Sequence, residues 1–223
     1  MIINKESYQN IVEIANQHNT TVVAVSKTKS VENIQSLYNL GQRDFGENYV
    51  QELVNKQQQL PKDIRWHFIG HLQSNKVKKI ISFVHLIQSV DSYRLLQEID
   101  KQAQKVNRRI DCLLQINIAT EETKFGLNED ALRMLICSMQ HSPLSNICIV
   151  GFMGMASLSI NETQVRKEFQ ALNQLFNQYK SIQINNYNPH ILSIGMSSDY
   201  TIALEEGSTM VRIGSLLFGS RNT

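Results

Sequence analysis

The sequence is poor in cysteine, proline and tryptophan. Its 223 residues include three cysteines, three prolines and one tryptophan. The cysteines Cys112, Cys137 and Cys148 lie far apart and form no CxxC pair and no Cys/His cluster with zinc spacing. Two of them lie in apolar, strand-like runs, where a small buried side chain is expected. This cysteine usage favours a reducing compartment, so we expect a cytoplasmic protein without a metal site.

Long apolar runs and an excess of one charge are also missing. The longest apolar stretch, residues 147–156, has about half the roughly 20 residues that a membrane-spanning helix needs. Residues 1–10 are polar and lack the apolar core of a signal peptide. Lys and Arg number 22 against 20 Asp and Glu, and the net charge of +2 is too small for a nucleic-acid-binding surface. We therefore expect neither a membrane nor a nucleic acid as a partner.

Short apolar runs alternate with polar segments of helical period along the whole chain. Several runs are continuously apolar, as expected of strands buried on both faces. Between the runs, apolar residues recur at spacings of three and four, as at Val31, Ile34 and Leu37. Ser30 and Asn128 precede two such segments and are predicted helix caps. The strand-like runs are residues 22–27, 43–46, 65–70, 85–90, 110–117, 147–155, 191–195 and 209–214.

Strands that alternate with helices form a parallel sheet through right-handed crossovers. Two arrangements are open, a closed barrel of eight units and an open, doubly wound sheet. The G-x-G-x-x-G fingerprint of dinucleotide-binding sheets is absent, and the length suits a barrel, which commonly has roughly 200–250 residues. We predict one domain, residues 1–223, folded as an α/β barrel of the (β/α)8 TIM type. Its chemistry should lie at the carboxyl ends of the strands.

Lys27 ends the first strand-like run, on the same face as Val23 and Val25. If the valines face the barrel interior, the Lys27 amine lies at the barrel mouth. Partial desolvation there disfavours the charged amine and provides a nucleophile for a carbonyl group. A solvated lysine that closes a strand is the alternative, and Lys29 is a rival nucleophile one step further into the loop.

Glycines and hydroxyl groups follow the seventh and eighth runs, in SIGMSSD at 193–199 and VRIGS at 211–215. Glycine allows close backbone approach, and hydroxyl and free N–H groups bind phosphate oxygens. Phosphate sites in barrels often follow strands seven and eight. The alternative is that Gly195 and Gly214 only form turns and that the serines cap helices.

Arg212 lies within the last strand-like run. An inward-facing guanidinium is costly without a partner, so it would indicate an anion or a heteroatom acceptor in the barrel. An outward arginine paired with Glu205 or Glu206 is equally compatible with the spacing.

His67 and His71 are four residues apart, but a glycine and a strand end lie between them. The two-histidine metal motif of a helix therefore does not apply. We expect a structural role for both histidines.

Six blocks resemble the pyridoxal-phosphate homeostasis proteins, a family related in fold to the barrel domain of alanine racemase. They cover essentially the whole chain in order. The sequence differs modestly from the family's usual motifs. It has GFMGM where G-L-M-x-I is more usual, and Ser215 where threonine is frequent. The blocks are VAVSKTK at 23–29, FGENYVQE at 45–52, WHFIGHLQSNK at 66–76, QINIATEETKFG at 115–126, GFMGM at 151–155 and LSIGMSSDYTIALEEGSTMVRIGSLLFGSR at 192–221.

The resemblance implies that the cofactor is pyridoxal 5′-phosphate (PLP), bound as an imine on Lys27 with Asn48 beside the pyridine ring. It implies that Arg212 faces the ring nitrogen, and Lys124 is a less certain secondary contact. The remaining implied contacts are Ser197, Ser198, Gly214 and Ser215 with the phosphate, and Met153 and Met196 in the pocket wall.

These roles favour a carrier over an enzyme. A guanidinium beside the ring nitrogen keeps that nitrogen unprotonated and makes the ring a poor electron sink. Racemisation also needs acid/base groups on both faces of the substrate. Alanine racemase-like enzymes take one such group from a second, β-rich domain, which a lone barrel lacks. We predict a protein that holds PLP and delivers it to recipient apo-enzymes, with little or no catalysis and no catalytic residues.

Two enzymatic alternatives remain. The first is a PLP-dependent amino-acid racemase or related fold-type III enzyme, with Tyr200 and His67 as its acid/base groups. The second is a barrel aldolase that uses Lys27 without a cofactor. Few exposed apolar stripes are evident, so a monomer is the expected state.

Overall fold

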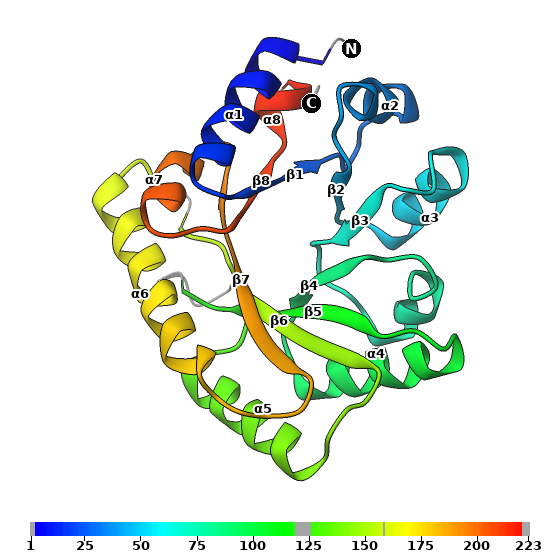
Figure 1. Cartoon of the computed structure of the whole chain (residues 1–223), viewed down its shortest axis with the longest axis vertical. Coiled ribbons are helices and arrows are strands. Elements are labelled where there is room, and N and C mark those ends of the chain that lie inside the picture. The colour runs from blue at the N-terminus through cyan, green and yellow to red at the C-terminus, as the bar shows by residue number, and fades with distance from the viewer. Residues whose placement is uncertain (1–2, 119–125, 158, 220–223) are drawn as a thin grey trace.

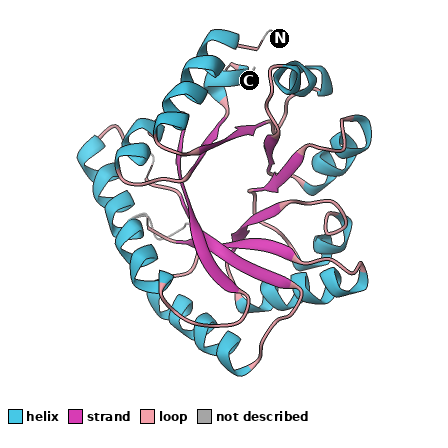
Figure 2. Cartoon of the chain, in the orientation of Figure 1, coloured by secondary structure: helices cyan, strands magenta, loops and turns pink. Residues whose placement is uncertain are grey.

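The structure, a computed structural model, describes residues 3–118, 126–157 and 159–219. In this part of the chain, eight parallel strands form a closed barrel in sequence order, and the last strand pairs with the first. Helices cover the outside of the barrel (Figure 1), and the strands form its inner wall (Figure 2). The predicted (β/α)8 barrel is confirmed, and the open sheet is wrong.

The elements follow the predicted alternation. The strands are β1 (Thr21–Val25), β2 (Asp44–Glu47), β3 (Arg65–Phe68), β4 (Leu86–Val90), β5 (Ile110–Ile116), β6 (Ile147–Gly154), β7 (Tyr187–Met196) and β8 (Met210–Ile213). The helices are α1 (Lys5–Gln17), α2 (Val31–Asn39), α3 (Val50–Gln59), the 3₁₀ helix η1 (Ser74–Lys79), α4 (Tyr93–Lys105), α5 (Glu129–His141), α6 (Glu162–Lys180), α7 (Tyr200–Glu205) and α8 (Ser215–Phe218).

Side-chain caps define where several helices begin. The side chain of Ser30 accepts a hydrogen bond from the N–H of Asn33 at the start of α2. Asn128 accepts one from the N–H of Ala131 at the start of α5. Both caps satisfy backbone groups that a helix leaves unpaired, and both were predicted. The first and last helices also meet. The N–H of Asn4, just before α1, donates to the carbonyl of Leu217 in α8 at 2.9 Å, and α1 lies beside α8 (Figure 1).

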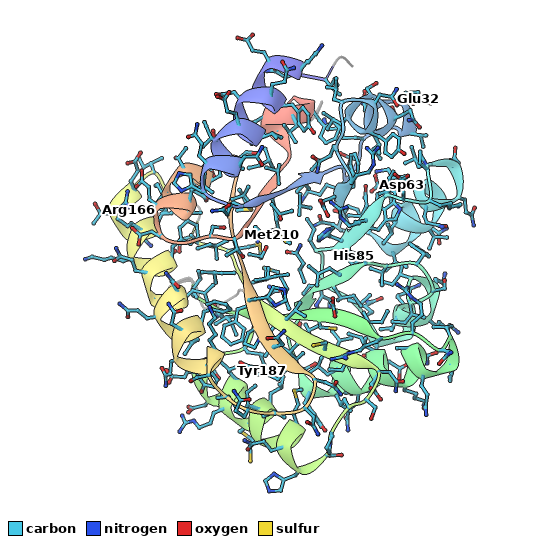
Figure 3. The ribbon with its side chains drawn as sticks, viewed as in Figure 1. Glu32, Asp63, His85, Arg166, Tyr187 and Met210 are labelled. Carbon is cyan, nitrogen blue, oxygen red and sulfur yellow. The ribbon has the colours of Figure 1, made fainter. Side chains whose placement is uncertain are left out.

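The strands bury both of their faces. Large side chains such as Phe45, Phe68 and Phe152 belong to the main core cluster. A smaller cluster on the inward faces includes Val23 and Met210, and Figure 3 shows Met210 near the centre of the barrel. Two-sided burial explains why the strand-like runs are continuously apolar.

β7 begins earlier than the predicted run at 191–195, and it contains Pro189. Its register with β6 changes between the pairs Ile149/Tyr187 and Gly151/Ile191. Pro189 lies in this irregular stretch, where a missing N–H costs least. A Cβ atom at Gly151 would lie 1.8 Å from the carbonyl oxygen of Ile191, so only glycine allows this approach of the two strands.

Cys112 and Cys148 are buried, as predicted for the strand-like runs, and Cys137 is exposed. Burial raises the pKa of the Cys112 thiol, so this side chain acts as a small apolar group. Within the residues described, no helix combines the length and the apolar character that crossing a membrane requires.

Candidate functional site

A cavity of about 410 Å³ opens at the carboxyl ends of the strands. This is the end at which barrels of this kind place their chemistry. Among the residues that the resemblance singled out, the cavity is lined by Lys27, Asn48, Met196, Ser197, Ser198, Arg212, Gly214 and Ser215.

Met153 does not line this cavity. It is 1% exposed and packs in the inward cluster of the barrel, and the cavity wall is formed by Met155 instead. Side chains two apart on a strand share a face, so Met155 takes the same direction nearer the mouth. Gly154 between them turns outward, where a Cβ atom would lie 2.5 Å from Leu172 on α6. Lys124 lies outside the described residues.

Lys27 reaches the cavity through the alternation of β1. Val23 packs in the inward cluster, and Val25 and Lys27 follow on the same side and line the cavity. This confirms the inward placement predicted for Lys27. Lys29 also lines the cavity, but its amine donates to the carbonyls of Phe218 and Gly219 at 3.2 and 3.3 Å.

A buried ionic cluster lies behind Lys27, between β2 and α3. The amine of Lys56 donates to Glu47 Oε1 at 2.7 Å, to Glu52 Oε1 at 2.6 Å and to the carbonyl of Ser26 at 2.7 Å. The hydroxyl of Ser26 donates to Glu47 Oε1 at 2.6 Å. Burial raises the pKa of Glu47, and the charge and hydrogen bond of Lys56 oppose that shift.

This cluster fixes the backbone on both sides of Lys27. Glu52 Oε1 also accepts the N–H of Thr28 at 2.6 Å, and Thr28 has a left-handed φ of 64°. A non-glycine residue holds that conformation only where its surroundings stabilise it. Sequence reasoning missed this role of Glu52 and Lys56, although their i,i+4 spacing on a helix was a detectable signal.

Arg212 points into the barrel and is 4% exposed. One terminal nitrogen donates to both the carbonyl and the hydroxyl of Ser193 at 2.7 Å, and the other donates to the carbonyl of Gly154 at 2.9 Å. Burial lowers the pKa of Arg212 to about 10, with partial opposition from the charge of Asp199. The guanidinium is therefore still cationic at neutral pH.

The alternative of an outward Arg212 is wrong. Glu205 and Glu206 pair instead with Arg166 on α6, each at 2.6 Å. Arg166 lies on the outer side of the barrel (Figure 3). Arg212 thus has neutral protein acceptors, and three of the five N–H groups of a guanidinium are used by them.

The turn after β7 brings hydroxyl groups to β8. Asp199 accepts the N–H of Met196 at 2.6 Å and the hydroxyl of Ser198 at 3.3 Å. The hydroxyl oxygen of Ser197 accepts the N–H of Gly214 at 3.1 Å. Gly195 has a packing role, because it has φ +93° and a Cβ atom there would lie 2.5 Å from that of Ala203.

His67 lies in the barrel interior, outside the cavity wall. Its Nε2 is 3.0 Å from Asp44 Oδ1, and its Nδ1 is 3.0 Å from the side-chain nitrogen of Gln88. His71 Nδ1 lies 3.3 Å from Asp91. Among the described residues, no group of three or more His, Cys, Asp and Glu side chains is placed to hold a metal ion.

The fold and this site place the protein in the class of alanine racemase-like barrels. The model for the alanine racemase N-terminal domain matches residues 5–222. An alanine racemase structure from Clostridium difficile 630 superimposes with a TM-score of 0.74 at 15% identity, covering 99% of this chain and 62% of that one. At this identity the likeness shows the fold alone.

Nearer relatives narrow the class. The chain is 41% identical to a pyridoxal phosphate homeostasis protein of Aquifex aeolicus, covering 90% of this chain and 86% of that one. It is 38% identical to one of Schizosaccharomyces pombe, covering 96% and 89%. PipY of Synechococcus elongatus, solved with PLP bound, superimposes with a TM-score of 0.84 at 32% identity, covering 96% of this chain and all of that one. The chain belongs to the family of pyridoxal phosphate homeostasis proteins.

Replacing Lys56 with methionine should lower the free energy of unfolding by about 3–5 kcal/mol, because it leaves Glu47 buried without its cation. Urea denaturation measures this loss. Lys62→Met is the control, because Lys62 is exposed and its amine donates to the carbonyl of Gln57 at 2.8 Å. It should change stability by less than about 0.5 kcal/mol. A Lys56→Met protein as stable as the wild type would contradict a buried ion pair.

Asp44 gives the protein a pH-dependent stability. Burial alone would raise its pKa, but hydrogen bonds from His67 and Arg65, the charge that His67 carries once its ring is protonated in acid, and the charge of Arg65 lower it from 3.8 to about 2. A lowered carboxyl pKa stabilises the fold above the unfolded value, and this stability is lost as pH falls through about 2. Asp44→Asn should therefore cost about 2 kcal/mol at pH 7. Its difference from the wild type should shrink between about pH 4 and pH 2.

Guanidinium denaturation across this pH range measures the Asp44 effect. Asp63→Asn serves as the control, because Asp63 pairs with Arg43 at an exposed position and should matter little. A constant difference between the wild type and Asp44→Asn down to pH 2 would contradict the assignment.

Proposed function

We propose that this protein holds PLP as an imine on Lys27 and delivers it to other proteins, with little or no catalysis. The observation that carries this proposal is the meeting of an amine, a buried guanidinium and a serine-glycine turn in one cavity, at Lys27, Arg212, Ser197 and Gly214. The names of the relatives and the PLP-bound PipY structure support it.

The residues present fit the cofactor. The side-chain oxygen of Asn48 is buried and has no hydrogen-bond partner in the structure, although Asn48 lines the cavity. A buried acceptor without a partner costs free energy, and a bound polar ligand would relieve that cost. The two N–H groups of Arg212 that remain after its three protein bonds suit a ring nitrogen, which is an acceptor.

Each residue then has a defined task. Lys27 would supply the amine that condenses with the cofactor aldehyde with loss of one water, and exchange of that imine with the amine of another protein would free the lysine amine without hydrolysis. Ser197, Ser198 and Ser215 offer hydroxyl groups to the phosphate. When bound, PLP supplies an aldehyde for reversible imine exchange and a ring that can accept electrons. Because Arg212 donates to the ring nitrogen, it weakens that electron acceptance.

The site supports carriage over the racemase alternative. Tyr200 and His67, the acid/base groups of that alternative, are not among the residues that line the cavity. The tyrosine is half-buried against the main core, and His67 is bound to Asp44 and Gln88. Racemisation requires acid/base groups on both faces of the substrate α-carbon, and neither of these two side chains is placed at the cavity to supply one.

Recipients are apo-enzymes that use PLP, because they present a lysine amine that can take over the imine. Among the described residues, the large exposed hydrophobic side chains Tyr49, Val106, Met134 and Ile160 belong to different segments. Scattered exposure of this kind supports a monomer. The free cysteines support a reducing, cytoplasmic setting.

The first test is the near-ultraviolet and visible spectrum of the purified protein after addition of PLP. The wild type should show an imine band that borohydride fixes, and Lys27→Ala should lack it, because the imine needs this amine. Lys29→Ala is a matched control, since Lys29 lines the same cavity but bonds to two carbonyls. It should keep the band. No band in the wild type, or an equal band in Lys27→Ala, would overturn the proposal.

Delivery is tested separately. Loaded protein should lose its imine band faster with a PLP-dependent apo-enzyme than with an inert trap of matched capacity, because direct exchange avoids hydrolysis. Stopped-flow absorbance measures both rates, and borohydride-reduced protein gives the blank. Equal rates would contradict direct delivery of PLP to the apo-enzyme, and the proposal that the protein binds PLP would still stand.

A further inference from the structure

A row of polar side chains crosses the apolar interior of the barrel, from Arg212 at the cavity to Asp44 near the opposite end. Arg212 donates to the Ser193 hydroxyl at 2.7 Å, which donates to Gln88 Oε1 at 2.7 Å. The Gln88 side-chain nitrogen is 3.0 Å from His67 Nδ1, and His67 Nε2 is 3.0 Å from Asp44 Oδ1. Each step crosses from one strand to another.

The direction of every bond in this row follows from Arg212. A guanidinium only donates, so the Ser193 oxygen accepts and its hydrogen is left for Gln88. The Gln88 oxygen is thereby used, and its NH₂ group must face His67. The second N–H of that group donates to Met210 Sδ at 3.2 Å. His67 therefore accepts at Nδ1 and carries its proton on Nε2, toward Asp44.

The side chains of this row are buried, so water does not satisfy their hydrogen bonds. Ser193 and Gln88 are fully buried, and His67 is 1% exposed. Polar groups in such a core are costly unless they are satisfied, and these are satisfied by one another. Apolar side chains of the inward cluster, such as Val23 and Leu113, lie in the same interior.

We propose that Ser193, Gln88, His67 and Asp44 act together as positioning residues for Arg212. They hold the guanidinium in the orientation that presents its remaining N–H groups to the cavity. This rests on the proposed function, because the group to which Arg212 is presented is the ring nitrogen of PLP. In every hydrogen bond of the row the donor lies on the Arg212 side and the acceptor lies on the Asp44 side. Because the last acceptor is a carboxylate, the row polarises electron density from Asp44 toward the Arg212 cation.

The first experiment is the affinity for PLP and the position of the imine band in Ser193→Ala. We expect binding about tenfold weaker, the effect of losing one hydrogen bond to a charged group, and a shifted band, because the ring nitrogen loses a fixed partner. Ser208→Ala is the matched control. Ser208 is also buried, but its hydroxyl bonds to the backbone of Ile194 and Met210. It should lower stability and leave affinity and band unchanged.

A double-mutant cycle separates positioning from general stability. If Ser193 acts through Arg212, Ser193→Ala should have no further effect on affinity in an Arg212→Met protein. Additive losses in the double variant, or a Ser193→Ala protein with wild-type affinity and band, would overturn the proposal. In either case the wild-type imine band would still stand for the proposed function.

A measurement on the protein without PLP tests the direction of the row by itself. Nitrogen-15 NMR of histidine-labelled protein without cofactor should show His67 as the tautomer protonated on Nε2 and unprotonated on Nδ1. Gln88→Met should change the Nδ1 resonance, since it removes the donor at 3.0 Å. A proton on Nδ1 would reverse the row and overturn the inference even if the protein binds PLP.

Discussion

The burial of one positive charge without a carboxylate in contact is the constraint on which this site depends. Arg212 is desolvated enough for burial to lower its pKa to about 10, and its protein partners are two carbonyls and a hydroxyl. Neutral acceptors stabilise the cation without cancelling it. A charge kept in this way inside a barrel mouth remains available to an electron-rich ligand, whereas a salt bridge with Glu205 or Glu206 would have consumed it.

Two different supports hold the two ends of the site. The lysine end is supported from outside the strand wall, where Lys56 and Glu52 bond to the backbone of Ser26 and Thr28 on either side of Lys27. Glu47 accepts hydrogen bonds from the Lys56 amine and the Ser26 hydroxyl. The arginine end is held from inside the wall by the interior row. Both supports use buried polar groups whose partners are complete, apart from one unpaired oxygen of Glu47. The barrel thereby holds Lys27 and Arg212 in a rigid frame, supported from opposite sides of its strand wall.

Much of this arrangement could be predicted from the sequence, because a strand imposes a period of two. The face shared by Val23, Val25 and Lys27 is a local property, and so are the caps at Ser30 and Asn128. The depth of a residue along the barrel axis depends on how all the strands are staggered, which the local sequence does not show. For this reason Met155 takes the place in the cavity wall that the resemblance suggested for Met153. The partners of Arg212 lie on other elements, as do Glu47 and Ser26, which bond to Lys56, and sequence spacing carries no information about such contacts.

The strand wall between the two supports has a consequence for how the site can vary. No side chain is shared between the outer cluster around Lys56 and the inner row that ends at Asp44, in the part of the chain that the structure describes. Substitutions can therefore weaken the support of Lys27 without removing a hydrogen-bond partner of Arg212, and the reverse also holds. With the proposed imine on Lys27 and the proposed ring contact of Arg212, the lifetime of the imine and the selectivity for the ring would be separately adjustable properties of one small barrel.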